Sequence, residues 1–212
     1  MTPQDLRRFA PATDRNCQPI LEVLEKFLPP SGTVLEVASG TGQHSVFFAP
    51  QLQPRHWLSS DPDPQNRASI IAWTTHEPCN TLHGPVDLDA RLSDWPLSTV
   101  KSLDLKAHPI TAIVNINMIH ISPWAACLGL ISGAKRVLST GGILYLYGPF
   151  KRGGEHTAPS NQAFDQSLQL QNPEWGVRDL DEVTAVAQAA GFGLVNVVQM
   201  PANNLSVIFQ RI

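Results

Sequence analysis

The sequence predicts an α/β fold: a seven-stranded, mostly parallel sheet with an antiparallel last strand and helices on both faces. First, the apolar run "TVLEVA" leads into the glycine turn "SGTG" and then into a helix-compatible segment. Second, strand and helix patterns alternate in five βα steps up to residue 148. Third, the β-rich runs "GLVNVVQM" and "LSVIFQRI" follow each other across the short link "PANN", which favours an antiparallel hairpin.

Each element follows from a local pattern. Apolar residues recur at helical spacing from Asn16 to Leu28, and "PPSG" then ends the first helix. The predicted strands are "TVLEVA", "RHWLSSD", a third strand ending in "GPVDLD", "ITAIVNINMI", "ILYLYG" and the two terminal runs. The predicted helices between them are "GQHSVFFAPQL", "NRASIIAWTTH", "WAACLGLISGAKRVL" and residues 180–190, the last ended by Gly191.

Residues 149–179 interrupt this alternation. They are polar and rich in turn residues, and "NQAFDQSLQL" is their one plausible helix. We interpret them as an insertion that forms a lid on the substrate side of a single domain, residues 1–212. Residues 1–30 of this domain form an N-terminal lid and helix. A length of 212 residues with 42% hydrophobic residues suits one α/β domain.

Charge and composition exclude several classes of partner. The formal net charge is −3, which gives no general attraction for nucleic acid or an anionic membrane. The N-terminus lacks the apolar core of a signal peptide, and no run approaches the roughly 18 apolar residues of a membrane span. We therefore expect a cytoplasmic protein. Cys17, Cys79 and Cys127 are widely spaced, so we expect free thiols and no structural metal.

The glycine turn is the first candidate binding element. Gly40 and Gly42 remove side chains where a helix N-terminus meets the end of a strand, so a ligand can approach the backbone closely. The alternative is a tight turn without a ligand. A dinucleotide fingerprint would place a third glycine where Ser45 stands, which weakens a nicotinamide reading, and the missing GK[ST] excludes a triphosphate loop.

Two acids mark the same predicted sheet edge. Asp61 ends the second strand about twenty residues after Gly42, where a carboxylate accepts hydrogen bonds from ribose hydroxyls in NAD and adenosyl sites alike. Asp87 follows the third strand and is placed to accept from an adenine amino group. The alternatives are structural: Asp61 starts a turn, and Asp87 caps a helix or turn.

These residues resemble the class I S-adenosylmethionine-dependent methyltransferases, a Rossmann-like superfamily. Its first motif runs acid-x-Gly-x-Gly-x-Gly, and "EVASGTG" supplies Glu36, Gly40 and Gly42, with Ala38 in place of the first glycine. Segments such as "DRNCQPILEVL", "NINMIHISPWAA" and "PEWGVRDL" resemble one narrower, poorly characterised group, which includes human methyltransferase-like protein 26.

The resemblance implies S-adenosylmethionine as cofactor and assigns residues to it. Glu36 serves the methionine end, Asp61 the ribose, and Asp87 with Leu88 the adenine edge. The resemblance also places at the cofactor the turn residues Ala38, Gly40, Thr41 and Gly42, and Asn117 and Met118 just past the fourth strand. Methyl transfer from a sulfonium is an in-line displacement that needs positioning and no metal.

A second group of residues provides candidates for binding the methyl acceptor and for catalysis. His120 is a candidate general base, with a structural hydrogen-bonding role as the alternative. Asp14, Arg15 and Asn16 precede the predicted first helix and form either an N-cap with solvated neighbours or a lid. In the lid, Arg15 and Asn16 bind the cofactor, Arg15 by pairing with its carboxylate, and Asp14 is a candidate catalytic residue. Tyr147 ends the fifth strand and is a candidate catalytic residue that lines the acceptor pocket.

The sequence thus predicts an S-adenosylmethionine-dependent methyltransferase with a small-molecule acceptor and with no nucleic-acid or membrane partner. Two alternatives stay open: an NAD-type oxidoreductase, and a regulatory protein that binds S-adenosylmethionine without turnover.

Overall fold

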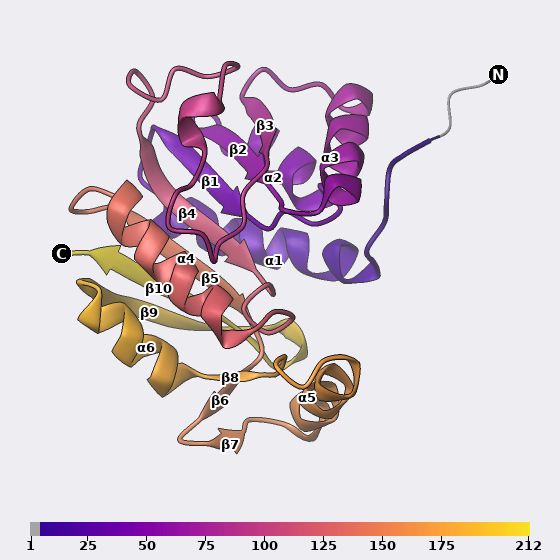
Figure 1. The fold of residues 1–212 in the computed structure, drawn as a ribbon, viewed down its shortest axis with the longest axis vertical. Helices are drawn as coiled ribbons and strands as arrows, with labels where there is room; N and C mark the ends of the chain where they lie inside the picture. The colour runs from indigo at the N-terminus through magenta and orange to yellow at the C-terminus, as the bar shows by residue number, and fades with distance from the viewer. Residues whose placement is uncertain (1–4) are drawn as a thin grey trace. The chain divides into compact units, whose positions relative to one another are not determined.

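The computed structural model describes residues 5–212 and confirms the predicted α/β fold (Figure 1). Its main sheet has seven strands in the order β3-β2-β1-β4-β5-β10-β9, and a small second sheet has the order β7-β6-β8. The chain divides into two compact units. The first comprises Met1–Asp89 and Trp95–Ala112, the second Ala90–Asp94 and Ile113–Ile212, so the division runs through β4 (Ile110–Ile116).

The first unit carries the first three strands and their helices. In chain order its elements are α1 (Pro11–Phe27), β1 (Thr33–Val37), α2 (Gln43–Gln51), β2 (His56–Ser60), α3 (Pro64–His76), β3 (Leu82–Val86) and the short 3-10 helix Leu97–Thr99. Strand β1 pairs with β2, and β2 with β3, all in parallel. All five residues of β1 are buried, as expected for a strand with both faces covered.

Two boundaries in this unit differ from the sequence prediction. Helix α1 begins at Pro11 rather than near Asn16, because a proline in the first turn has a preset φ and needs no hydrogen-bond partner for its nitrogen. The count of five βα steps is also too high: the prediction named no helix between the third and fourth strands, and the structure has only the 3-10 helix Leu97–Thr99 between β3 and β4. That connection contains Pro96 and many polar residues, without an apolar helical period.

The second unit carries the remaining strands. Its elements after β4 are α4 (Trp124–Val137), β5 (Ile143–Gly148), β6 (Phe150–Arg152), β7 (Glu155–His156), α5 (Pro159–Gln171), β8 (Arg178–Asp179), α6 (Leu180–Ala189), β9 (Phe192–Met200), the 3-10 helix Pro201–Asn203 and β10 (Asn204–Arg211). Strand β10 pairs antiparallel with both β5 and β9, which confirms the predicted terminal hairpin.

The insertion is more ordered than its composition suggested. Its predicted helix is α5, but strands β6, β7 and β8 were not predicted. Strand β6 pairs antiparallel with β7 and parallel with β8. Because these strands are two or three residues long, they lack the alternating pattern that reveals a strand in a sequence.

The cysteines follow the prediction. Cys127 is buried, Cys17 and Cys79 are half-buried, and all of them are free thiols. None of the helices formed by residues 5–212 is long and apolar enough to cross a membrane.

Candidate functional site

The glycine turn, residues 38–42, joins β1 to α2 in the first unit. Ala38, Gly40 and Gly42 all have positive φ, at 59°, 58° and 89°. A Cβ on Gly42 would lie 2.9 Å from the Cα of Ile70 in α3, whereas a Cβ on Gly40 would meet no atom within 4 Å. Gly42 is therefore required by helix packing, and Gly40 leaves room for a close approach to the backbone.

Asp61 is fixed directly to this turn. The backbone N–H of Gly40 donates to its Oδ2 at 2.9 Å. Its Oδ1 accepts from the backbone N–H of Asp63 at 2.9 Å and from the amide of Asn66 at 3.2 Å. The side chain is buried, and this burial raises the pKa of Asp61 despite the hydrogen bonds that oppose the shift. The sequence singled out the glycine turn and Asp61 separately, and in the structure a hydrogen bond joins them.

Glu36 points into the interior of the first unit. Its Oε2 accepts from the hydroxyl of Ser45 at 2.5 Å and from the indole N–H of Trp57 at 3.0 Å. The hydroxyl of Ser59 in turn donates to that of Ser45 at 3.0 Å. Burial raises the pKa of Glu36, and these donors oppose the shift. Glu36 thus ties β1 to α2 and β2, and its predicted role at the cofactor stays a prediction.

Arg67 holds the ends of β2 and β3 together. Its Nη1 donates to the carbonyls of Asp61 and Pro62, at 2.9 and 2.7 Å, and to Oδ1 of Asp87 at 3.0 Å. The side chain of Asp87 is 70% exposed, so this ion pair adds little stability but orients the carboxylate. Leu88 beside it is fully buried.

Asp14, Arg15 and Asn16 lie inside α1 and not before it, which corrects the predicted placement and its N-cap alternative. The capping position is Ala10, without a side-chain cap. Asp14 and Arg15 are exposed. Asn16 is buried, and its Oδ1 lies 2.8 Å from Nε2 of His44 in α2. Their roles at the cofactor and in catalysis stay predictions.

The segment before α1, within the residues 1–30 predicted as a lid and helix, makes contacts with the turn that the sequence did not reveal. The backbone N–H of Ala10 donates to Oε1 of Gln43 at 2.6 Å, and the hydroxyl of Thr41 donates to the same oxygen at 3.2 Å. The preceding Arg8 contacts Asn66 and Ser69 of α3. The one signal in the sequence was the polar pair at positions 66 and 69, since residues three apart share a helix face.

The loop after β4 belongs to the second unit. Asn117 has a φ of 63°, a conformation that asparagine tolerates better than most residues, and its N–H donates to the carbonyl of Tyr147 at 2.8 Å. Met118 and Tyr147 are both buried. The assignment of Asn117 and Met118 to the cofactor and of Tyr147 to the acceptor stays a prediction.

His120 lies in the same loop and is completely buried. Its Nδ1 accepts from the backbone N–H of Arg178 at 3.3 Å, and its carbonyl accepts from that of Gly176 at 2.9 Å. Burial, with the nearby charge of Arg178, lowers the pKa of His120 to about 3. The ring is therefore neutral near pH 7 but weakly basic, and its role as a general base stays a prediction beside the structural alternative.

Asp165 of α5 is the polar centre of the insertion. Its Oδ2 lies 2.8 Å from Nζ of Lys151 and 3.2 Å from Nε2 of His156, and its Oδ1 accepts from the backbone N–H of Val177 at 2.7 Å. Burial raises the pKa of Asp165, but the hydrogen bonds and the charge of Lys151 outweigh it, so the pKa lies below the usual value. One carboxylate thus links β6, β7, α5 and the segment before β8.

A model of the family described as Protein of unknown function (DUF938) matches residues 7–211, so the chain belongs to that family. A putative O-methyltransferase from Nostoc punctiforme PCC 73102 aligns with 94% of this chain and 58% of its own, at 14% identity and a TM-score of 0.74. Human N-acetylserotonin methyltransferase, solved in complex with S-adenosylmethionine, aligns with 94% of this chain and 52% of its own, at 12% identity and a TM-score of 0.72.

An O-methyltransferase family protein from Burkholderia thailandensis aligns with 94% of this chain and 57% of its own, at 16% identity and a TM-score of 0.71. The chain thus spans little more than half the length of these solved structures. At such low identity, the likeness shows a shared fold.

Proposed function

We propose that this member of the DUF938 family is an S-adenosylmethionine-dependent methyltransferase that acts on a small-molecule acceptor. The observation that carries the proposal is the hydrogen bond from Gly40 to Asp61, at 2.9 Å. It joins a turn open to a ligand with a buried carboxylate at the adjacent strand end, where a ribose is bound in Rossmann-like folds. We extend the proposal to kinship with the group that includes human methyltransferase-like protein 26, supported by "NINMIHISPWAA" and "PEWGVRDL".

The residues of the first unit fit an adenosyl cofactor. When bound, S-adenosylmethionine supplies a methyl group on a positively charged sulfur. Asp61 accepts from the ribose hydroxyls and Asp87 from the adenine amino group, and the buried Leu88 supports the adenine edge from within the core. Gly40 admits the ligand to the backbone at the turn. These residues orient the cofactor, and orientation supplies much of the rate of an in-line displacement.

The nicotinamide alternative has weaker support. A third glycine would let strand and helix approach closely in a dinucleotide site, but Ser45 occupies that position and donates to Glu36. The common dinucleotide-binding sheet continues in strand order from the fifth strand to a parallel sixth, whereas here the antiparallel β10 lies next to β5.

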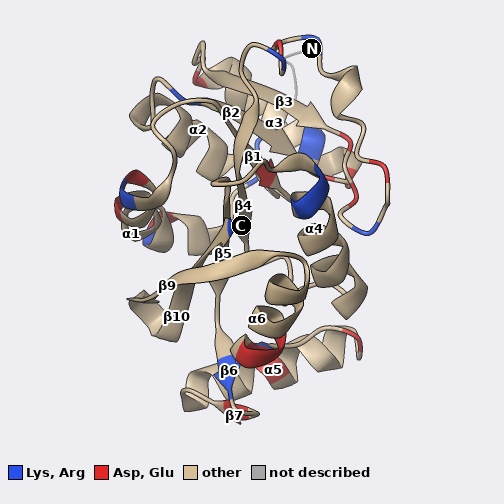
Figure 2. Ribbon diagram, turned by 90° about the vertical axis from the view of Figure 1, so that its left-hand side faces the viewer, with Lys and Arg blue, Asp and Glu red and all other residues tan. Residues whose placement is uncertain are grey.

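A small acceptor is supported by the charges of the insertion, which are of both signs (Figure 2). Its basic groups are largely engaged in internal contacts. Lys151 pairs with Asp165, and Arg178 donates to the carbonyls of Ile119, Ser122 and Glu174. A nucleic-acid substrate would require basic groups that face a phosphate backbone.

Calorimetry with S-adenosylhomocysteine, the demethylated product, tests the cofactor. We expect wild-type protein to bind it, and Asp61→Ala to weaken the affinity by about 1 to 3 kcal/mol, the usual cost of removing one partner from buried polar groups. Asp63→Asn is the matched control, because that exposed side chain caps α3 and asparagine preserves the cap. Equal affinity in Asp61→Ala, or a preference for NAD, contradicts the assignment.

Turnover needs a separate assay. Incubation of the protein with a metabolite extract and methyl-labelled cofactor is expected to transfer label to a small molecule. Label on protein would reject the proposed acceptor class. Cofactor binding with no label transfer to any fraction would favour the regulatory alternative.

A further inference from the structure

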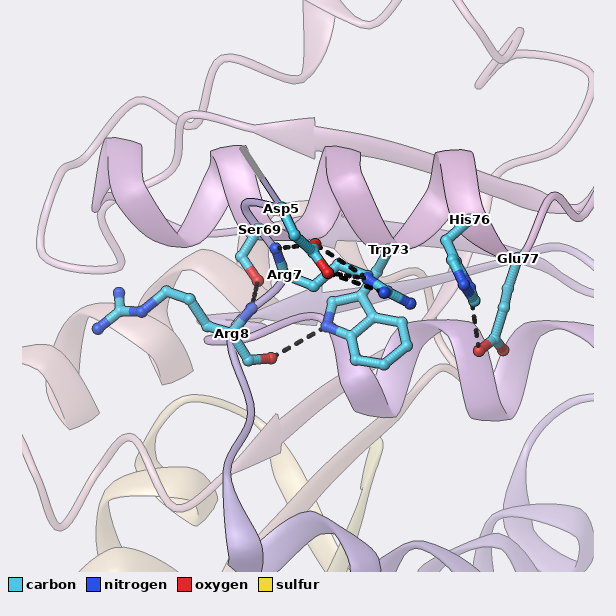
Figure 3. A network of polar contacts seen from close by, with 7 residues as sticks. All are labelled: Asp5, Arg7, Arg8, Ser69, Trp73, His76 and Glu77. Carbon is cyan, nitrogen blue, oxygen red and sulfur yellow. Dashed lines mark hydrogen bonds and ion pairs between the residues drawn. The ribbon is translucent and has the colours of Figure 1, made fainter. Parts of the chain in front are cut away.

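Residues 5–10 form a strap that is hydrogen-bonded to α3 within the first unit (Figure 3). The backbone N–H of Arg8 donates to the hydroxyl of Ser69 at 2.8 Å, and the indole N–H of Trp73 donates to the carbonyl of Arg8 at 3.0 Å. Both polar groups of the Arg8 backbone therefore bind side chains about one turn apart on α3. This fixes the strap's position and direction on the helix.

Other side chains of the strap contact one another or the indole of Trp73. Arg7 pairs with Asp5 at 2.8 Å, and its guanidinium lies 5.1 Å from the ring centroid of Trp73 (Figure 3). Phe9 packs edge-on against the same indole at 5.0 Å. Exposed ion pairs contribute little. The strap is thus held mainly through Arg8 and the aromatic contacts with Trp73.

Two hydrogen-bonded routes lead from Arg8 to the candidate site. In the first, the hydroxyl of Ser69 accepts from Arg8 and donates to the carbonyl of Thr41 in the glycine turn at 2.7 Å. In the second, Nη1 of Arg8 donates to Oδ1 of Asn66 at 2.8 Å, and Nδ2 of Asn66 donates to Oδ1 of Asp61 at 3.2 Å. One strap residue thus contacts partners of both the turn and the acid.

We propose that Arg8, Asn66 and Ser69 are positioning residues for the adenosyl ligand, and this rests on the proposed function. An asparagine amide has one accepting and one donating end, and its orientation is set by its neighbours. Arg8 binds the oxygen of Asn66, so the nitrogen faces Asp61. The reverse orientation would place an oxygen against the carboxylate. The strap thereby keeps the carboxylate of Asp61 oriented as an acceptor for ribose hydroxyls.

The same geometry couples docking of the strap to binding of the ligand. If the docked strap improves the affinity for the ligand, the bound ligand must stabilise the docked strap by the same factor. The amides of Arg8 and Ala10 report on docking, because both donate to side chains, those of Ser69 and Gln43. Their hydrogen exchange is expected to slow several-fold when S-adenosylhomocysteine binds.

Calorimetry with S-adenosylhomocysteine on variants of the whole chain tests the routes. Arg8→Ala and Asn66→Ala are each expected to raise Kd about three- to tenfold, the size of a typical hydrogen-bond loss. Arg8→Lys keeps a donor and should recover most of the affinity. Leu6→Ala on the strap and Gln65→Ala on α3 change exposed side chains and are matched controls, and neither should change Kd more than about twofold.

A double-variant comparison separates positioning from general destabilisation. With Asp61→Asn already present, Asn66→Ala should cause little further loss, because the group it positions has been replaced. Unchanged Kd in both Arg8→Ala and Asn66→Ala, with unchanged amide exchange on ligand binding, would overturn the inference and leave the proposed cofactor in place. Failure of wild-type protein to bind the ligand would overturn both.

Discussion

The imidazole of His120 packs directly against Gly148: a Cβ built on that glycine would lie 2.5 Å from Nε2. The same Cβ would lie 3.2 Å from Oδ1 of Asn117. The end of β5 and the loop after β4 therefore approach each other at a distance that glycine alone permits among the standard residues.

Gly148→Ala is expected to lower the free energy of unfolding by about 1 to 3 kcal/mol, because the added methyl group forces the buried ring to move. Urea denaturation measures the loss. When His120→Ala is already present, adding Gly148→Ala should lower the free energy of unfolding by much less than it does in the wild type. Additive costs would contradict the packing explanation.

His44 predicts an acid-sensitive fold. Burial lowers its pKa from 6.5 to about 4, so as the pH falls the unfolded chain takes up the proton before the folded chain does. The stability that depends on a neutral His44 is fully present above pH 6.5. As the pH falls towards 4, the free energy of unfolding decreases for this reason by about 3 kcal/mol at most. Urea denaturation at several pH values should show a shallower dependence for His44→Gln than for wild type. Parallel curves would contradict this prediction.

Ala38 is expected to limit stability. An alanine at a φ of 59° has its Cβ close to the following carbonyl, which costs about 1 kcal/mol. Ala38→Gly relieves this cost but adds roughly 0.5 kcal/mol of entropy cost through the unfolded chain, so the free energy of unfolding should rise by roughly 0.5 kcal/mol. Gly42→Ala should have the opposite effect, since its Cβ would lie 2.9 Å from the Cα of Ile70. A loss of stability in Ala38→Gly would reject the strain argument.

Asp165→Asn is expected to loosen the insertion. The substitution removes the charge that Lys151 and His156 share, while the remaining oxygen still accepts from Val177. Stranding a partly buried ammonium costs about 1 to 3 kcal/mol. Limited proteolysis should show faster cleavage within residues 150–179, whereas the exposed control Glu155→Gln should match wild type. Equal cleavage of Asp165→Asn and wild type would show that the carboxylate does not hold the insertion together.

The ordering of the insertion bears on its predicted role as a lid. Wild-type protein can be tested by the same proteolysis with S-adenosylhomocysteine and, once it is identified, the acceptor. We expect slower cleavage of residues 150–179 when both are bound. An unchanged pattern would contradict closure over the site.

The sequence predicted the main sheet well because its strands are buried and apolar, and because turn residues separate them. It identified Gly40 and Asp61 separately, and the structure joins them by a hydrogen bond. The proposed role of Asn66 was missed because a single polar residue in a helix does not alter the apolar pattern from which a sequence is interpreted. Its partners, Arg8 and Asp61, are far apart in the chain and meet through tertiary packing.

The setting of His120 could not be predicted either. Its residue type suggested a base, whereas its basicity depends on solvation, and its burial against Phe150 and Gly148 is a tertiary property. The start of α1 was placed late because Pro11 and the residues after it are polar or small. The helix period becomes visible at Ile20, the first of its large buried residues.

The position of β10 has a consequence for the order in which the second unit forms during synthesis. Strand β9 emerges first, yet β10 lies between β9 and β5 in the sheet. A growing chain that has reached Met200 can form β5 and α6 but has no strand with which to join β9 to the sheet. We therefore expect β9 to become protected from proteolysis only after Arg211 has left the ribosome, so that this part of the sheet forms late and through non-local pairing.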